Sequence, residues 1–168
     1  KQLAALKLMR YQDPQNRFSL IVPGAWFQAE NTTLNQALYL SQNKADNPVF
    51  TFVVSVYKVN LSPKFGALDT VNQLSKMLLD EGKRHGVKVI QSETANADQI
   101  GPDIAAGSLV LSYNTSSGKE IGQLHTILVD GKNAIDIQLN GEEKVMDTAL
   151  FLYQVASQSL WTKRICEK

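Results

Sequence analysis

The sequence predicts an α+β fold in which an antiparallel sheet of about six strands is flanked by helices on both faces, as an α/β/α sandwich. Three observations support this prediction. A strand over 49–59 is apolar on both sides, three strands with short turns follow one another between 109 and 140, and helical periodicity is confined to two segments. The regular strand–helix alternation of a doubly wound parallel sheet does not occur in this order.

The first predicted elements are two short strands. Residues 17–22 are mostly apolar and rich in strand formers, and Pro23 and Gly24 then favour a turn. A second strand is expected over 34–40, and the polar segment 43–48 is expected to be a loop.

The segment 49–59 has the strongest strand signal in the chain. Its apolar side chains fall into two alternating sets, with two hydroxyl residues inside the second set. A strand that is apolar on both faces is typical of the centre of a sheet that is covered on both sides. The first set is Phe50, Phe52, Val54 and Val56, and the second is Val49, Val53, Tyr57 and Val59.

A helix is predicted in the middle of the chain. Apolar residues recur every three or four positions from 68 to 81, and Gly82 follows directly as a candidate C-terminal cap. A strand is then expected over 87–93. The segment 94–107, which contains a Gly-Pro-Asp sequence, is expected to be a long connection.

Three strands and a second helix complete the predicted fold. Alternating patterns over 109–113, 124–130 and 135–140 predict the strands, and Asp130-Gly131-Lys132-Asn133 is a hairpin signal. The closing helix is expected from about Glu142 to Thr162, with Asn140 or Gly141 as its cap. Its apolar stripe is Val145, Ala149, Leu152, Ala156 and Leu160.

The composition fits one globular domain. The chain has 168 residues, of which 43% are hydrophobic and 20% are charged. A chain of this length buries roughly 70% of its unfolded surface, so it needs no metal or disulfide to fold. The net charge of +1 and the scattered basic residues argue against nucleic-acid binding. No apolar run approaches the ~20 residues of a transmembrane helix.

We expect a single domain over 11–162, with an N-terminal extension over 1–10 and a C-terminal tail over 163–168. A helix is one alternative for the extension. The sequence begins with Lys rather than Met. We therefore expect a processed N-terminus, and membrane anchoring through a removed upstream segment is one alternative.

The sequence contains no motif that assigns catalytic, cofactor-binding or metal-binding residues. A Gly-rich phosphate loop and a GxSxG nucleophile elbow are both absent. His125 is expected to be a sheet residue on the face opposite Leu124 and Leu128. His85 is expected to be a solvated cation at a helix end.

A few residues remain as candidates for function. Trp26 and Trp161 are the candidates for a groove or a partner contact, although a Trp after a Pro-Gly turn most often pins that turn to the core. Cys166 is interpreted as an unpaired tail cysteine, with a reactive thiol or an intermolecular disulfide as the alternative. A hydrolase that uses Ser108 or another hydroxyl with His125 is the enzymatic alternative.

A family resemblance begins at residue 11. The segment 11–26, Tyr-Gln-Asp-Pro-Gln-Asn-Arg-Phe-Ser-Leu-Ile-Val-Pro-Gly-Ala-Trp, is similar to the opening of PsbP-like and DcrB-like domains, with Leu20 where Ile is usual. The order of elements over 11–162 also resembles that family. The resemblance implies a PsbP-type α/β/α sandwich around an antiparallel sheet, and it transfers no functional residue.

The resemblance also implies a functional class. Family members are mostly non-enzymatic. They include exported bacterial proteins and lipoproteins, plant and cyanobacterial proteins that assist photosystem II, a eukaryotic branch that binds a small GTPase, and bacterial chaperones of secreted effectors. We therefore expect a non-catalytic binding or assembly module without a cofactor, exported as a periplasmic or membrane-anchored bacterial protein, with another protein as its partner. The alternatives are a cytoplasmic chaperone or adaptor for secreted effectors and an unrecognised hydrolase.

Overall fold

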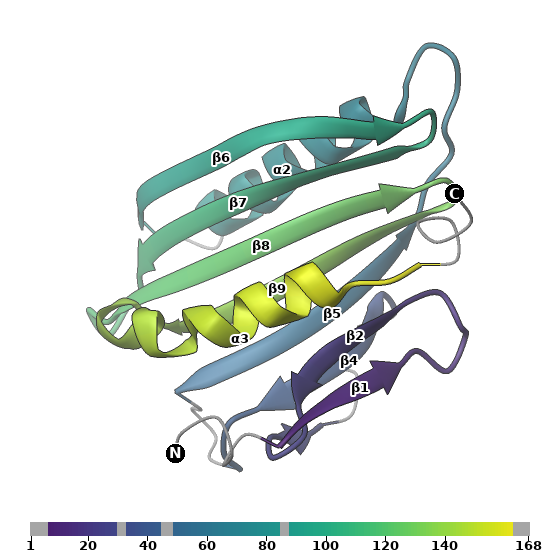
Figure 1. The fold of residues 1–168 in the computed structure, drawn as a ribbon. Coiled ribbons are helices and arrows are strands. Elements are labelled where there is room, and N and C mark those ends of the chain that lie inside the picture. The colour runs from purple at the N-terminus through teal and green to yellow at the C-terminus, as the bar shows by residue number, and fades with distance from the viewer. Residues whose placement is uncertain (1–6, 30–32, 45–48, 85–87, 163–168) are drawn as a thin grey trace.

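The computed structural model describes residues 7–29, 33–44, 49–84 and 88–162. Its strands form one seven-stranded antiparallel sheet, in the order β3-β4-β5-β9-β8-β7-β6, and a separate two-stranded ribbon of β1 and β2 (Figure 1). In chain order the elements are β1 (Leu8–Gln12), β2 (Ser19–Pro23), β3 (Phe27–Gln28), β4 (Gln36–Ser41), β5 (Phe50–Lys58), α2 (Ala67–Arg84), β6 (Lys88–Gly101), β7 (Ile104–Asn114), β8 (Glu120–Asp130), β9 (Asn133–Glu142), a 3₁₀ helix (Glu143–Val145) and α3 (Met146–Ser159).

The predicted fold class is confirmed, because helices lie on both faces of an antiparallel sheet. Helix α3 and the β1–β2 ribbon cover one face, and α2 covers the other (Figure 1). The main sheet has seven strands rather than about six, because the two-residue strand β3 adds an edge. The predicted strand at 17–22 becomes β2 and pairs with β1 outside the main sheet.

Strand β5 is central, as its two-sided apolar pattern predicted, and it pairs with β4 and β9. Alternation along β5 and β9 sends one set of side chains into the core beneath α3 and the opposite set to the α2 side. The α3-side core includes Phe52, Val54, Ile135, Ile137 and Leu139, all of which are fully or almost fully buried.

A smaller core lies beneath α2. Ala67 and Val71 of the helix pack with Ala105, Ile127 and Val129 of the sheet. The predicted helix is confirmed, but it continues through Gly82 to Arg84 instead of ending before the glycine. Glycine lowers helix propensity by only about 1 kcal/mol, which the packing of the earlier apolar stripe on the sheet outweighs.

The expected long connection at 94–107 is wrong. Residues 88–101 form one strand, β6, which turns at Pro102 and returns as β7. The pattern concealed this strand because its pairing with β7 shifts register at three places, and a bulge interrupts the alternation on which strand prediction depends.

The closing helix is shorter than predicted. Asn140 and Gly141 belong to β9 rather than capping the helix, and α3 ends at Ser159 instead of Thr162. After the helix, Trp161 exchanges two backbone hydrogen bonds with Ser19 of β2, at 2.8 and 2.9 Å. The extended backbone after the helix thus forms an antiparallel bridge with the edge of β2.

The N-terminal part differs from the expected extension over 1–10, since Leu8–Arg10 already belong to β1. Residues 1–6 and the tail 163–168 lie outside the described residues. The single domain over 11–162 stays a prediction. No helix within the described ranges is both long and apolar enough to cross a bilayer.

The turn between β1 and β2 is held by an ion pair. The Arg17 guanidinium donates to both carboxylate oxygens of Asp13, at 2.7 and 2.9 Å, and the Arg17 backbone N–H adds a third bond at 3.0 Å. Asp13 is 1% exposed. Burial alone would raise the pKa of Asp13, but the hydrogen bonds from Arg17 outweigh it and the pKa is lowered.

Replacing Gly107 tests the close approach of α2 to the sheet. A Cβ at this position would lie 2.8 Å from Val71 Cγ1 and 3.2 Å from Ala97 Cβ. We expect Gly107→Ala to lower the free energy of unfolding by about 1–3 kcal/mol, because the helix must shift. Chemical denaturation measures this, and Ser108→Ala is the control on the same strand. Equal stability of the two variants would contradict the close packing.

Acid titration of unfolding tests the Asp13–Arg17 pair. Because the folded-state pKa of Asp13 lies below its ordinary value of 3.8, its contribution is complete above that value and is lost as the pH falls through the lowered pKa. We expect Asp13→Asn to lower the free energy of unfolding by about 2 kcal/mol at pH 7. The difference from wild type should shrink in acid, and a pH-independent difference would refute this assignment.

Candidate functional site

The α2 side of the sheet is divided between a covered half and a polar half. Helix α2 packs on β6, β7 and β8. On the same side, β5 and β9 and their neighbours present polar and aromatic side chains, several of them half-buried. We call this surface the polar sheet face, and it consists of Tyr39, Thr51, Ser55, Tyr57, Gln123, His125, Asp136, Gln138 and Asn140.

Hydrogen bonds join the residues of this face across strands. The Gln138 amide donates to Asn140 Oδ1 at 2.6 Å, and the Asn140 amide donates to Thr51 Oγ1 at 3.1 Å. The first bond lies within β9, and the second runs from β9 to β5, which are paired in register at Thr51 and Asn140. The contacts hold the amide groups in place along the face, which makes it an ordered polar surface.

A buried His–Asp pair lies at the centre of the face. His125 and Asp136 are 1% and 3% exposed, and His125 Nδ1 lies 3.0 and 3.2 Å from the two Asp136 oxygens. The other ring nitrogen, Nε2, lies 3.3 Å from Gln123 Oε1, and the Gln123 amide donates to the Tyr113 hydroxyl at 3.3 Å. Both ring nitrogens therefore face polar partners within the sheet.

This placement confirms the predicted orientation of His125, which points away from the α3 side. Ser108 pairs with Thr126 on β8, and Thr126 Oγ1 hydrogen-bonds to Tyr153 of α3. Alternation therefore places Ser108 on the α3 side of the sheet, whereas His125 is on the opposite side. The suggested Ser108–His125 catalytic pairing is wrong.

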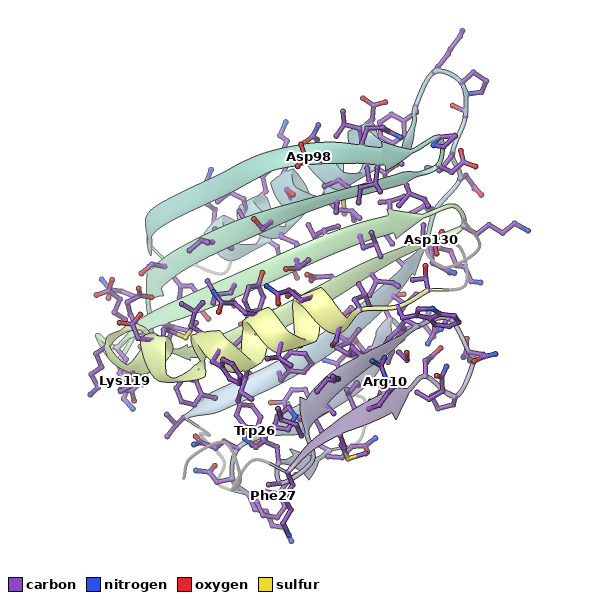
Figure 2. The ribbon with its side chains drawn as sticks, viewed as in Figure 1. Arg10, Trp26, Phe27, Asp98, Lys119 and Asp130 are labelled. Atoms are coloured by element: carbon purple, nitrogen blue, oxygen red, sulfur yellow. The ribbon has the colours of Figure 1, made fainter. Side chains whose placement is uncertain are left out.

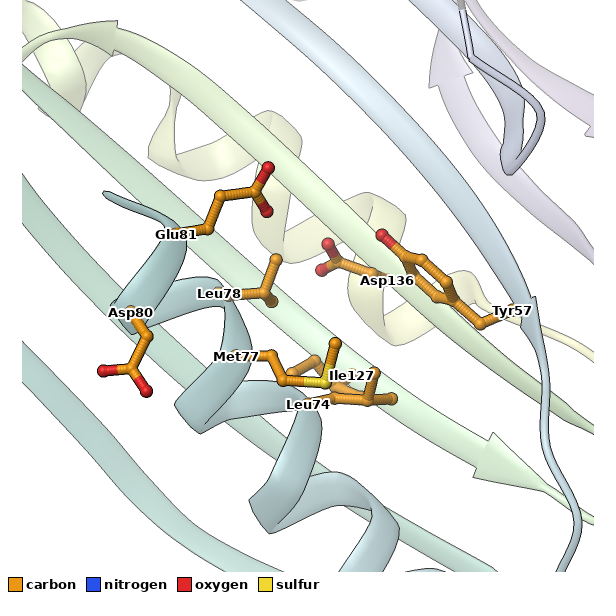
Figure 3. Close-up of a pocket in the computed structure, with 8 residues that line it drawn as sticks. All are labelled: Tyr57, Leu74, Met77, Leu78, Asp80, Glu81, Ile127 and Asp136. Atoms are coloured by element: carbon orange, nitrogen blue, oxygen red, sulfur yellow. The ribbon is translucent and has the colours of Figure 1, made fainter. Parts of the chain in front are cut away.

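A cavity of about 470 Å³ lies where the polar sheet face meets α2 (Figure 3). Figure 3 shows side chains extending from the helix on one side and from the sheet on the other, with Asp80 pointing away from the rest. Burial raises the pKa of Tyr57, and the charges of Asp136 and Glu81 raise it further. The lining residues are Tyr57, Leu74, Met77, Leu78, Asp80, Glu81, Ile127 and Asp136.

A second hollow, of about 390 Å³, lies at the other end of the polar sheet face, where Tyr39, Thr51 and Asn140 contribute to its lining. Figure 2 shows Lys119 at this end of the sheet. Lys119 Nζ and Lys144 Nζ lie 3.1 and 3.0 Å from the Glu142 carboxylate. Hydrogen bonds from Lys144 and Lys119 lower the pKa of Glu142.

The two tryptophans lie apart from this face. Trp26 is 9% exposed and its ring stacks on Phe50 in the α3-side core, with the centroids 6.4 Å apart. It therefore pins the turn after Pro23, while Trp161 is half-buried and pairs with β2 through its backbone. A partner contact through either residue stays a prediction. His85 and Cys166 lie outside the described residues.

Sequence reasoning missed the polar sheet face as a unit. Its signal is present in β9, where Asp136, Gln138 and Asn140 alternate with buried aliphatic residues. Such alternation in a central strand indicates that one face is polar. The partner of His125 could not be found in this way, because the register between β8 and β9 decides which side chains become neighbours.

A double-mutant cycle tests the His125–Asp136 pair. Each single change to Ala leaves a buried polar group without its partner, so the two effects should overlap. We expect a coupling of about 1–3 kcal/mol in the free energy of unfolding, measured by chemical denaturation. His125→Ala combined with Asp147→Asn, which lies on α3, should be additive. Additive effects in the His125–Asp136 cycle would show that the pair is not coupled.

Comparison with known proteins identifies the fold. Neither a protein-family model nor a curated protein sequence matches this chain. Among solved structures, cyanobacterial PsbP (CyanoP) from Synechocystis has a TM-score of 0.65 at 16% identity, with 94% of this chain and 93% of that chain covered.

Two further structures show the same likeness. The Saccharomyces cerevisiae Ran-binding protein Mog1p has a TM-score of 0.57 at 8% identity, covering 94% of this chain and 96% of its own. LpqN, involved in cell envelope biogenesis of Mycobacterium tuberculosis, has a TM-score of 0.56 at 14% identity, covering 92% and 89%. The chain therefore has the PsbP-like fold that its opening segment predicted.

Proposed function

We propose that this chain is a non-catalytic protein-binding module that binds its partner through the polar sheet face. The observation that carries the proposal is the arrangement of this face. Half-buried tyrosines and ordered amides lie between two hollows, on the side of the sheet where α2 covers only the β6–β8 half. Tyrosine is enriched at protein interfaces, because it combines a large apolar ring with a hydrogen-bonding hydroxyl.

The chemistry of the face also favours binding over catalysis. The ring nitrogens of His125 contact Asp136 and Gln123, so this histidine has a carboxylate and an amide as neighbours rather than a nucleophile. A sheet face with fixed hydrogen-bonding groups presents a preorganised surface, and a partner that binds it loses little affinity to side-chain ordering.

The fold comparisons support a protein partner in general. Mog1p is named as a Ran-binding protein, so one protein of this fold binds another protein. Fold likeness alone does not transfer a partner, and the proposal therefore names the surface rather than the bound protein.

We also propose that the protein is exported to the periplasm or the cell envelope. It is supported by the likeness to LpqN, which is involved in cell envelope biogenesis. The alternative of a cytoplasmic chaperone or adaptor for secreted effectors is favoured by a different observation. Leu150 and Phe151 are adjacent on α3 and are 37% and 45% exposed, as an apolar contact for a partner segment requires.

Binding measurements with a face variant test the proposal. A photo-crosslinking residue at Thr51 in the native cell identifies the partner, and calorimetry then measures the affinity of the purified pair. We expect Tyr39→Ala to weaken binding about tenfold or more, because truncated interface tyrosines are often hot spots. Phe151→Ala is the matched control on α3 and should leave the affinity unchanged.

Two results would contradict the proposal. Unchanged affinity for Tyr39→Ala together with a loss for Phe151→Ala would move the contact to α3, as the chaperone alternative requires. Turnover of a substrate that stops when Asp136 is replaced would show that the face is catalytic. Thermal unfolding of both variants keeps a loss of folding separate from a loss of binding.

A further inference from the structure

The cavity beneath α2 is lined mostly by apolar side chains. At about 470 Å³ it lies within the range of roughly 300–1,000 Å³ that is typical of ligand pockets. Leu74, Leu78 and Ile127 line it, and Met77 lines it while remaining 57% exposed. An alkyl chain that enters between α2 and the sheet would therefore contact aliphatic groups from both sides.

Among the described residues, the charged side chains that line the same cavity are all carboxylates. Asp136 comes from β9 and Glu81 comes from the last turns of α2, so the two carboxylates reach the cavity from different elements (Figure 3). The third lining carboxylate, Asp80, points away and lies 3.9 Å from Lys83. Within the described part of the chain, neither lysine nor arginine lines the cavity.

Asp136 and Glu81 differ in how the protein surrounds them. Asp136 is buried, and both of its carboxylate oxygens lie within hydrogen-bonding distance of His125 Nδ1. Glu81 is exposed on the helix at the edge of the cavity. Burial is the main cause of the raised pKa of Tyr57, and the nearby carboxylates of Asp136 and Glu81 raise it further.

An apolar interior with an acidic wall complements an alkyl stem that ends in a cation. We propose that this cavity receives a basic side chain, of which lysine is the simplest, from the protein partner that binds the polar sheet face. The inference rests on the proposed function and adds the chemistry of one contact. Lysine buries its methylene stem along apolar surface while its ammonium group seeks anionic or hydrated positions, and this cavity offers both environments.

Titration of the isolated protein with n-pentylammonium chloride tests the cavity directly. This probe reproduces a lysine stem and its charge. In methyl NMR spectra we expect saturable shifts at Leu74, Leu78 and Ile127, with an affinity that falls as salt is added. The neutral pentanol and the anionic pentanoate serve as matched probes, and the pentanoate should produce no saturable shift. Equal binding of ammonium and pentanoate would overturn the inference.

Three variants locate the interaction. Glu81→Gln removes the exposed carboxylate and should weaken pentylammonium binding about threefold to fivefold. Asp147→Asn removes an equal charge on α3 and should leave the affinity unchanged. Met77→Trp introduces a bulky group from an exposed position, so it should block binding without disturbing the core. Retained binding in Met77→Trp, with thermal unfolding unchanged, would exclude this cavity.

A second probe separates a protein side chain from a free amine. N-acetyl-lysine methylamide should shift the same methyl signals and respond to the same variants. If pentylammonium binds and the lysine derivative does not, the assignment to a partner side chain is wrong. If neither probe binds while Tyr39→Ala still lowers the affinity for the partner protein, the inference about the cavity fails and the proposed function stands.

Discussion

Strands β5 and β9 have chemically different faces, and the arrangement of the other elements depends on that difference. On one side, their aliphatic and aromatic residues form the core beneath α3. On the other side, Ser55, Asp136 and Gln138 place polar groups at the centre of the sheet. Burying a polar group is costly unless it is hydrogen-bonded. The hydrogen-bonded side-chain amides of Gln138 and Asn140 and the His125–Asp136 pair meet that requirement.

Because of this difference, the side of the sheet that contributes most to stability is not the side that carries the polar surface. Helix α3, the β1–β2 ribbon and the extended backbone at Trp161 enclose the larger core, so the α3 side supplies most of the apolar burial. Helix α2 is displaced toward β6, β7 and β8, where Gly107 permits a close approach. The displacement leaves a polar sheet face with a hollow at each end, and binding can use that face without opening the larger core.

Most of the fold could be predicted from the sequence, because local periodicity is strong in the elements that matter most. The two-sided apolar pattern of β5 indicated a covered central strand, and the hairpin signal at Asp130 predicted that β8 and β9 pair as antiparallel neighbours. Strand β6 escaped prediction because its bulges break the alternation. The candidate site could be predicted only in part. The side of the sheet on which His125 lies follows from alternation within one strand, but its contact with Asp136 depends on the register between two strands. The cavity depends on where α2 packs on the sheet.

Covalent labelling of tyrosines in the partner complex distinguishes binding at the polar sheet face from binding at α3, because it reports which side of the sheet becomes covered. Tyr39 and Tyr57 lie on the polar sheet face at opposite ends, and both are half-buried in the free protein. Binding through the polar sheet face should reduce hydroxyl-radical labelling of both tyrosines and leave labelling of Phe151 on α3 unchanged. Protection of Phe151 with unaltered labelling of Tyr39 and Tyr57 would contradict it.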